Sequence, residues 1–184
     1  MPQSKILVDT NSYFRLAQSI HPLLFAEFGE KKHCLYILPE LNTELHRNPS
    51  LQTKFAWALQ PEYVANRRVH PTLSRKEQNE VELAKGFIWD HVQTAMPGPS
   101  RVDAIYLSYG YVLKIPVVTD DRDMRALAAE FDIETMVTLE LLKIMLDCGH
   151  VNRGKVKEIY GYWDYSKDVP HNAEADLARL FGAL

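Results

Sequence analysis

The sequence has few of the features that mark secreted, membrane or zinc-binding proteins. Its only two cysteines, Cys34 and Cys148, are far apart and lie in apolar runs. We therefore expect two reduced, buried thiols rather than a disulfide framework or a zinc site. The apolar run before Asp9 is too short for a signal peptide, and no run reaches the ~20 apolar residues of a membrane span. These features predict a cytoplasmic protein without a membrane segment.

The chain also lacks internal repeats, low-complexity tracts and a strong charge of one sign. Its 184 residues have a net charge of −3, with 24% charged and 46% hydrophobic residues. This composition is typical of one compact domain, with or without an appendage, and allows a substantial core. Because an acidic catalytic site would itself lower the net charge, this value neither supports nor excludes a polyanionic substrate.

Short apolar runs alternate with helical patterns along most of the chain. Two capping-box patterns, at Ser74 with Glu77 and at Ser100 with Asp103, predict the starts of two long helices. We expect strands at 6–8, 34–38, 115–119 and 133–137, and helices within 13–28 (broken into two near His21-Pro22), 39–47, 50–59, 74–95, 100–115, 123–130, 139–147 and 173–181. The alternation predicts an α/β fold with a parallel sheet sandwiched by helices.

The pattern weakens after residue 148. Gly154, Gly161 and Pro170 stand among several aromatic residues there, which indicates an extension packed on the main domain. We therefore divide the chain into a domain at 1–148 and a C-terminal extension at 149–184. The stretch from 61 to 73 is rich in turn-forming and basic residues and has no clear assignment.

Acidic residues follow the predicted strands. Asp9 ends the first strand, and Asp120 and Asp121 follow the third. Parallel strands end at one edge of a sheet, and the helices that follow them leave at that same edge. Glu44 lies in such a helix, and Asp103 lies in the first turn of the helix that starts near Ser100. The candidate site is therefore Asp9, Glu44, Asp103 and Asp121, with Asp123 as a near neighbour.

Several carboxylates in one crevice repel one another unless a cation lies between them. Carboxylate oxygens favour Mg²⁺ or Mn²⁺, and two such ions ~4 Å apart can activate water and stabilise the leaving oxygen of a phosphodiester. Each acid also has a simpler interpretation. Asp9, Asp103 and Asp121 each suit a turn or a helix cap, and Glu44 suits a solvated helix face. The order of the acids along the chain favours the shared site.

Four segments carry a resemblance to a known family over about residues 5 to 146. They resemble the acidic motifs of PIN-domain nucleases: Ile6-Leu7-Val8-Asp9-Thr10-Asn11-Ser12, Leu38-Pro39-Glu40-Leu41-Asn42-Thr43-Glu44-Leu45, Ser100-Arg101-Val102-Asp103-Ala104 and Val117-Val118-Thr119-Asp120-Asp121-Arg122-Asp123-Met124. The resemblance implies a Rossmann-like, PIN-like sheet and an Mg²⁺- or Mn²⁺-dependent ribonuclease. Many bacterial members are toxins with an antitoxin partner, and many form homodimers.

The resemblance also implies roles for individual residues. Asp123 would be an auxiliary acid beside the four metal-binding acids, and Asn11 would support the turn after the first strand. Thr119 would orient the acidic loop, which is the segment Asp120-Asp121-Arg122-Asp123. Glu40 lies one helical turn before Glu44 and is the alternative ligand. The chain departs from the family in its greater length and in having Met124 where phenylalanine is usual.

Basic residues near these acids are candidates for phosphate contacts. We expect Arg47 and Arg122 to bind substrate, with a second basic cluster before the long helix: Arg67, Arg68, His70, Arg75 and Lys76. The leading hypothesis is a metal-dependent endoribonuclease. The alternatives are a catalytically silent PIN-like module that binds RNA or protein, and a structure-specific DNA nuclease.

Overall fold

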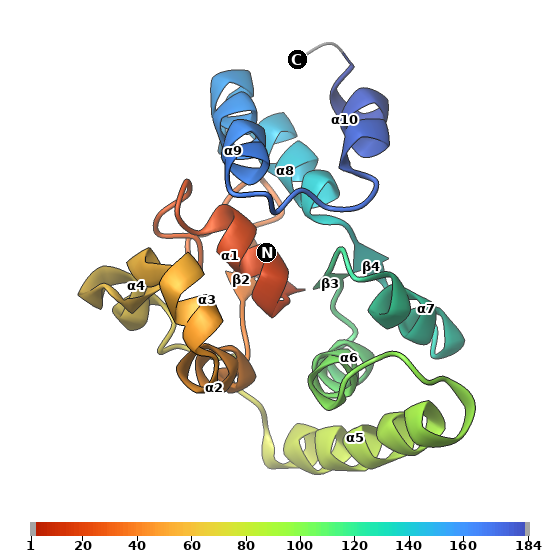
Figure 1. Ribbon diagram of the computed structural model, residues 1–184. Helices are drawn as coiled ribbons and strands as arrows, with labels where there is room; N and C mark the ends of the chain where they lie inside the picture. Colours follow the sequence, from red (N-terminus) through yellow and green to blue (C-terminus); the bar gives the residue numbers. More distant parts are fainter. Residues whose placement is uncertain (1–2, 183–184) are drawn as a thin grey trace.

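The computed structural model describes residues 3–182 and contains one parallel sheet (Figure 1). Strand β1 pairs in parallel with both β2 and β3, and β3 pairs in parallel with β4, which gives the order β2-β1-β3-β4. The strands are β1 (Ser4–Val8), β2 (His33–Tyr36), β3 (Val117–Val118) and β4 (Thr135–Met136). This arrangement confirms the predicted α/β class, although the last two strands are shorter than predicted.

Helices connect and surround these strands (Figure 1). Both predicted capping boxes form, at the starts of α5 and α6. The helices are α1 (Thr10–Leu16), α2 (Pro39–Arg47), α3 (Pro49–Lys54), the 3₁₀ helix η1 (Ala56–Leu59), α4 (Pro61–Asn66), α5 (Arg75–Ala95), α6 (Arg101–Leu113), α7 (Arg122–Glu130), α8 (Thr138–Asp147), α9 (Arg153–Tyr165) and α10 (Ala173–Phe181). Within residues 3–182, no helix is both long enough and apolar enough to cross a membrane.

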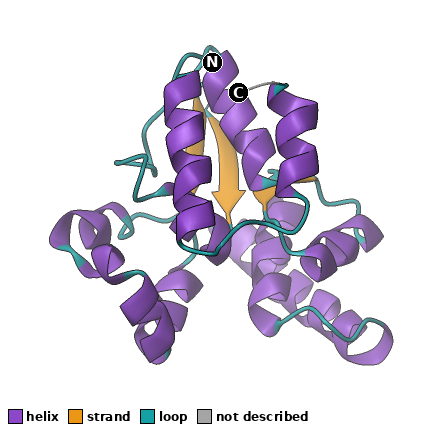
Figure 2. Ribbon diagram, turned by 45° about the horizontal axis from the view of Figure 1, so that its top comes forward, coloured by secondary structure: helices purple, strands orange, loops and turns teal. Residues whose placement is uncertain are grey.

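Each face of the sheet is covered by its own hydrophobic cluster. Along β1, Ile6 and Val8 belong to one cluster while Leu7 belongs to the other, as expected because successive side chains of a strand point to opposite faces. The first cluster includes residues of α1, α8 and α9, and the second includes residues of α5, α6 and α7. Figure 2 shows the strands between these helices. The predicted sandwich of helices around the sheet is therefore confirmed.

The structure corrects predictions about local structure and assigns a segment that the sequence left open. The second helix expected within 13–28 does not form, because the chain turns at Phe25 (φ 63°) and Phe28 then pairs with His33 in an antiparallel bridge. The unassigned basic stretch contains the short helix α4. Cys34 is buried as expected, but Cys148 is exposed because it lies at the C-terminal end of α8.

The C-terminal residues pack against the main body of the molecule. Helix α9 contacts α1 and α8, and α10 contacts α8. Trp163 of α9 is fully buried and its Nε1 donates a hydrogen bond of 2.8 Å to the carbonyl oxygen of Arg15. Val156, Ile159 and Phe181 join the same core cluster as α1. The extension thus shares a core with the sheet, and the boundary at residue 148 stays a prediction.

Candidate functional site

The site lies at the carboxyl edge of the two central strands. Val8 is paired with Val118, so β1 and β3 end side by side. Asp9 follows β1 directly, and its backbone N–H donates a 3.0 Å hydrogen bond to the carbonyl oxygen of Val118. The segment Thr119–Asp121 follows β3 and leads into α7. The register of this parallel pair therefore brings the two strand-end acidic motifs to one edge.

Asp9 is the most buried of the candidate acids, with 6% of its surface exposed. Its Oδ1 accepts a 2.7 Å hydrogen bond from the backbone N–H of Ser12, which caps α1. Burial raises the pKa of Asp9 to about 6, although hydrogen bonds from the side chains of Thr119 and Ser12 lower it in part. The negative charge of Asp120 adds to the rise. The hydrogen bonds to Asp9 therefore do not fully offset the cost of burying its negative charge.

Glu44 and Asp103 approach the same place from α2 and α6. The hydroxyl group of Thr10 donates a hydrogen bond to Glu44 Oε2. Burial raises the pKa of Glu44, and the charge of Asp103 raises it further. The pKa of Asp103 is likewise raised by burial and then by the charges of Asp121 and Asp123. Glu44 therefore lies close enough to Asp103, and Asp103 to Asp121 and Asp123, for their negative charges to interact.

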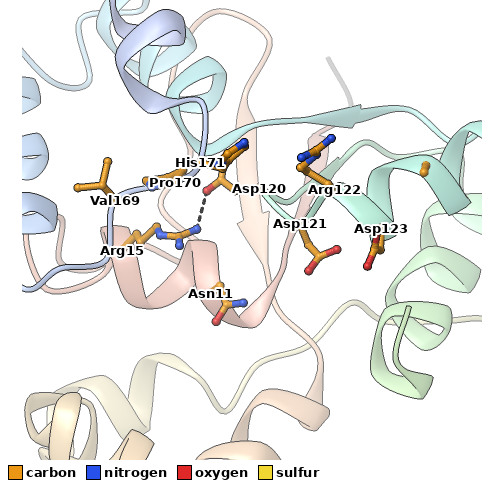
Figure 3. Close-up of a pocket in the computed structure, with 10 residues that line it drawn as sticks. Asn11, Arg15, Asp120, Asp121, Arg122, Asp123, Val169, Pro170 and His171 are labelled. Carbon is orange, nitrogen blue, oxygen red and sulfur yellow. Dashed lines mark hydrogen bonds and ion pairs between the residues drawn. The ribbon is translucent and has the colours of Figure 1, made fainter. Parts of the chain in front are cut away.

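The acids line two cavities. Asp9, Glu44 and Asp103 line a small one of about 80 Å³. Asp121 and Asp123 line a larger one of about 570 Å³ (Figure 3). Asn11 lines both cavities, so it lies at their boundary. The edge of the sheet therefore holds a narrow acidic pocket beside a wider acidic groove.

Three of the acids also have the simpler role of capping a helix. Asp9 caps α1, Asp103 completes the capping box of α6 with Ser100, and Asp121 Oδ1 accepts a 2.8 Å hydrogen bond from the backbone N–H of Met124. A carboxylate has two oxygens with about four acceptor positions, so one capping bond leaves capacity for another ligand. Capping holds these side chains at the edge and does not exclude metal binding.

The donor set suits a divalent cation. Within residues 3–182, none of the five candidate acids forms an ion pair with a basic side chain. Carboxylate oxygens without a cationic partner are the ligands that Mg²⁺ and Mn²⁺ favour. In the same range, no three His, Cys, Asp or Glu side chains already converge as a formed metal site. The residues fit such an ion by chemistry, and binding it requires their side chains to turn toward a common point.

Asp120 and Asp121 are adjacent but take part in different interactions. Asp120 Oδ2 forms a 2.8 Å ion pair with Arg15 Nη1, and its Oδ1 accepts a 2.9 Å hydrogen bond from the backbone N–H of Thr138. Thr119 Oγ1 accepts a 3.1 Å hydrogen bond from the backbone N–H of Asp121. Thr119 therefore contacts both Asp9 and Asp121, which suits the orienting role predicted for it.

Glu40 and Glu44 differ in the cavities that they line. Glu44 lines the small cavity with Asp9 and Asp103, whereas Glu40 does not. Both glutamates line a third cavity of about 600 Å³, to which Arg47 also contributes. The placement favours Glu44 over Glu40 as the residue that acts with Asp9.

The structure distinguishes between the predicted basic residues. Arg122 lines the large acidic cavity, and Arg47 lies beside Glu44. Arg67, in contrast, is 1% exposed, so the expectation that it contacts substrate is wrong. Its guanidinium group donates hydrogen bonds to Asn42 Oδ1 (2.9 Å), the hydroxyl of Tyr13 (3.1 Å) and the carbonyl oxygen of Ala58 (2.8 Å). Arg67 is a structural residue that joins α2, η1 and α1.

Sequence reasoning missed five residues of the large cavity, one of which is Ala126 of α7. Arg15 contributes from α1, where it lies four residues after Asn11 and so on the same helical face. That spacing was a usable signal. Val169, Pro170 and His171 contribute from the C-terminal extension, and nothing in their local sequence indicated that they reach the acidic edge.

No protein-family model and no curated protein matches this chain. Among solved structures, the chain is similar to one in "Crystal Structure of FitAcB from Neisseria gonorrhoeae", with 15% sequence identity and a TM-score of 0.46. The match covers 72% of this chain and 97% of that chain. At this identity the likeness concerns the arrangement of the backbone and does not extend to function.

Proposed function

We propose that this protein is a metal-dependent endoribonuclease that hydrolyses RNA phosphodiester bonds at the acidic edge of its sheet. One observation carries the proposal: Asp9, Glu44 and Asp103 line one cavity, and burial raises the pKa of each. Crowded carboxylates of this kind are unfavourable unless they serve to hold a cation. The order of the acidic motifs, which resembles that of PIN-domain nucleases, supports the same conclusion.

Asp9, Glu44, Asp103 and Asp121 would hold the metal, with Asp123 beside them. A bound Mg²⁺ or Mn²⁺ would lower the pKa of a coordinated water molecule and would offset negative charge on the reacting phosphate. Thr119 orients Asp9 and Asp121 through its side chain. Arg122 and Arg47 lie beside the acids, where each guanidinium group can bind a phosphate of the RNA chain.

The family resemblance implies a preference for RNA, a role as a toxin, an antitoxin partner and a homodimer. These four properties stay predictions. The large cavity supports a polynucleotide substrate, because it is open and combines acids with Arg122. A silent binding module with the same fold would keep the cavities and lack metal-dependent cleavage, so the experiment below separates the two.

The test is cleavage of fluorogenic single-stranded RNA with Mg²⁺, Mn²⁺ or EDTA. We expect metal-dependent cleavage by the wild type and a loss of at least about 100-fold in Asp9→Asn and Asp121→Asn, because each removes a ligand charge. Asp90→Asn is the matched control, since Asp90 is exposed on α5 and lines none of these cavities. Full activity in Asp9→Asn would exclude this site. A fluorogenic DNA strand of the same sequence tests the RNA preference.

Metal binding is measured separately by thermal unfolding at neutral pH. A ligand that binds only the folded state raises the melting temperature according to its affinity and concentration. We expect Mn²⁺ to raise the melting temperature of the wild type and of Asp90→Asn, with a smaller rise for Asp9→Asn. A wild type that shows neither metal-dependent cleavage nor a large metal-induced rise in melting temperature would favour the silent module instead.

A further inference from the structure

The C-terminal extension forms one wall of the large acidic cavity. Val169, Pro170 and His171 line it together with Asp121 and Arg122, although about fifty residues separate the two groups in sequence. Figure 3 shows the segment from the extension passing beside the acidic loop, with His171 on the same side of the cavity as Arg122. The cavity is therefore built by both parts of the chain.

An ion-pair network fixes this wall. Arg15 Nε lies 3.2 Å from Asp168 Oδ2 and also donates a 3.0 Å hydrogen bond to the carbonyl oxygen of Asp168. Lys54 Nζ adds a 2.9 Å ion pair to Asp168 Oδ1. Because Arg15 is also paired with Asp120, one guanidinium group joins the extension to the acidic loop. The residues that follow Asp168 are thereby held beside the site.

The fixed segment exposes one polar side chain to the cavity. Pro170 is buried, which anchors the backbone, while His171 is exposed. A histidine ring has at least one N–H donor in either protonation state. Arg122 is exposed at the same cavity and has guanidinium donors. Two sets of N–H donors beside a row of carboxylates are suited to bind a phosphate group next to the one at the acids.

We infer that His171, with Arg122, binds a backbone phosphate of an RNA strand that occupies the large cavity, so the C-terminal extension is part of the substrate-binding surface. The inference rests on the proposed function for the identity of the ligand. It adds a contact from outside the four acidic motifs. Val169 and Pro170 form the apolar side of the same wall.

The test is equilibrium binding of a fluorescein-labelled single-stranded RNA, followed by anisotropy in EDTA and low salt, so that cleavage does not intervene. We expect His171→Ala to bind this RNA at least about tenfold more weakly, which is the effect of losing one hydrogen bond to a charged group. His171→Gln keeps an N–H donor and should recover most of the affinity. Lys157→Ala is the control, because Lys157 is an exposed cation of the same extension and lines none of the cavities.

Two results would overturn the inference: equal affinity of His171→Ala and the wild type, or no RNA binding by the wild type. Unchanged melting temperatures in the three variants show that any loss of affinity is local. The outcome is distinct from that of the cleavage test. If His171→Ala binds RNA more weakly but the wild type cleaves no RNA, the contact of His171 with RNA is supported and the nuclease function is rejected. If the wild type cleaves RNA but His171→Ala binds it as tightly as the wild type, the nuclease function is supported and the contact of His171 is rejected.

Discussion

Arg15 pairs with Asp120 at 2.8 Å, and this ion pair explains why adjacent acids in the acidic loop differ. The side chains of Arg15 and Asp120 are 13% and 8% exposed, so the pair is largely shielded from water. Asp120 also bonds to Thr138 at the start of α8. Asp120 is therefore neutralised and structural, whereas Asp121 lies among acids that have no basic partner.

Replacing Arg15 by methionine should destabilise the protein strongly. The change keeps an unbranched apolar chain but leaves Asp120 with no cationic partner in a buried position, which typically costs about 3–5 kcal/mol. Arg179→Met is the matched control, because Arg179 also pairs with two acids, Asp176 and Glu140, but is 53% exposed. Its loss should cost less than about 1 kcal/mol. Urea unfolding measures both, and similar values for the two variants would contradict the structural role of Arg15.

Asp9→Asn should stabilise the metal-free protein in a pH-dependent manner. Burial raises the folded-state pKa of Asp9 to about 6, above its value near 4 in an unfolded chain. The folded protein therefore holds this proton more tightly, and the resulting stability is present below about pH 4 and lost as pH rises to about 6. Above that pH the ionised carboxylate costs on the order of 3 kcal/mol. Asparagine retains the cap of α1 without the charge.

The measurement is the melting temperature of both proteins in EDTA from pH 4 to pH 7.5. The advantage of Asp9→Asn should be small at pH 4 and grow up to about pH 6.5. A difference in melting temperature that does not change with pH, or a wild type that is more stable at neutral pH, would show that burial does not disfavour the ionised form of Asp9. Added Mn²⁺ should reverse the order at neutral pH, because only the wild type has the full set of acids.

The sequence was sufficient to predict the elements that position most of the acids. Local signals were strong at these points: apolar strands that end in Asp9 or in Thr119, and a capping box at Ser100 that also fixes Asp103. A parallel register then follows from the alternation of strands and helices, because crossover connections bring strand ends to one edge. The acidic edge is thus encoded by short-range patterns.

Long-range contacts could not be predicted in this way. Arg67 resembles its exposed basic neighbours in sequence, but in the fold it meets Tyr13, Asn42 and the carbonyl oxygen of Ala58. The contact of Arg15 with Asp168 joins residues 153 positions apart. Neither contact leaves a periodic or compositional signal. Only the tertiary arrangement shows that one basic residue is structural and that the extension borders the site.

Thr119→Val should impair the site more than the fold. Thr119 is fully buried, accepts a hydrogen bond from the N–H of Asp121 and bonds to the side chain of Asp9, where it lowers the pKa. Valine has the same shape without the hydroxyl, so we expect a loss of about 1–2 kcal/mol in stability and a higher pKa for Asp9. The acidic limb of the pH–rate profile should move to higher pH. Thr94→Val, which removes an exposed hydroxyl from α5, is the control. An unmoved limb would leave Thr119 with a packing role only.

Arg122→Ala and Arg47→Ala should each weaken RNA binding in a salt-dependent manner. A cation that neutralises one phosphate of a single strand contributes about 0.7 to the slope of log affinity against log salt concentration. Each variant should therefore bind more weakly at low salt and show a shallower slope by roughly that amount. Arg75→Ala is the comparison, because Arg75 belongs to the predicted basic cluster, lies at the start of α5 and lines none of the cavities at the acidic edge. Anisotropy at several salt concentrations in EDTA gives the slopes. A change in Arg75→Ala alone would place the RNA on the basic cluster, away from the acids, and would contradict the assignment of the acidic edge as the substrate site.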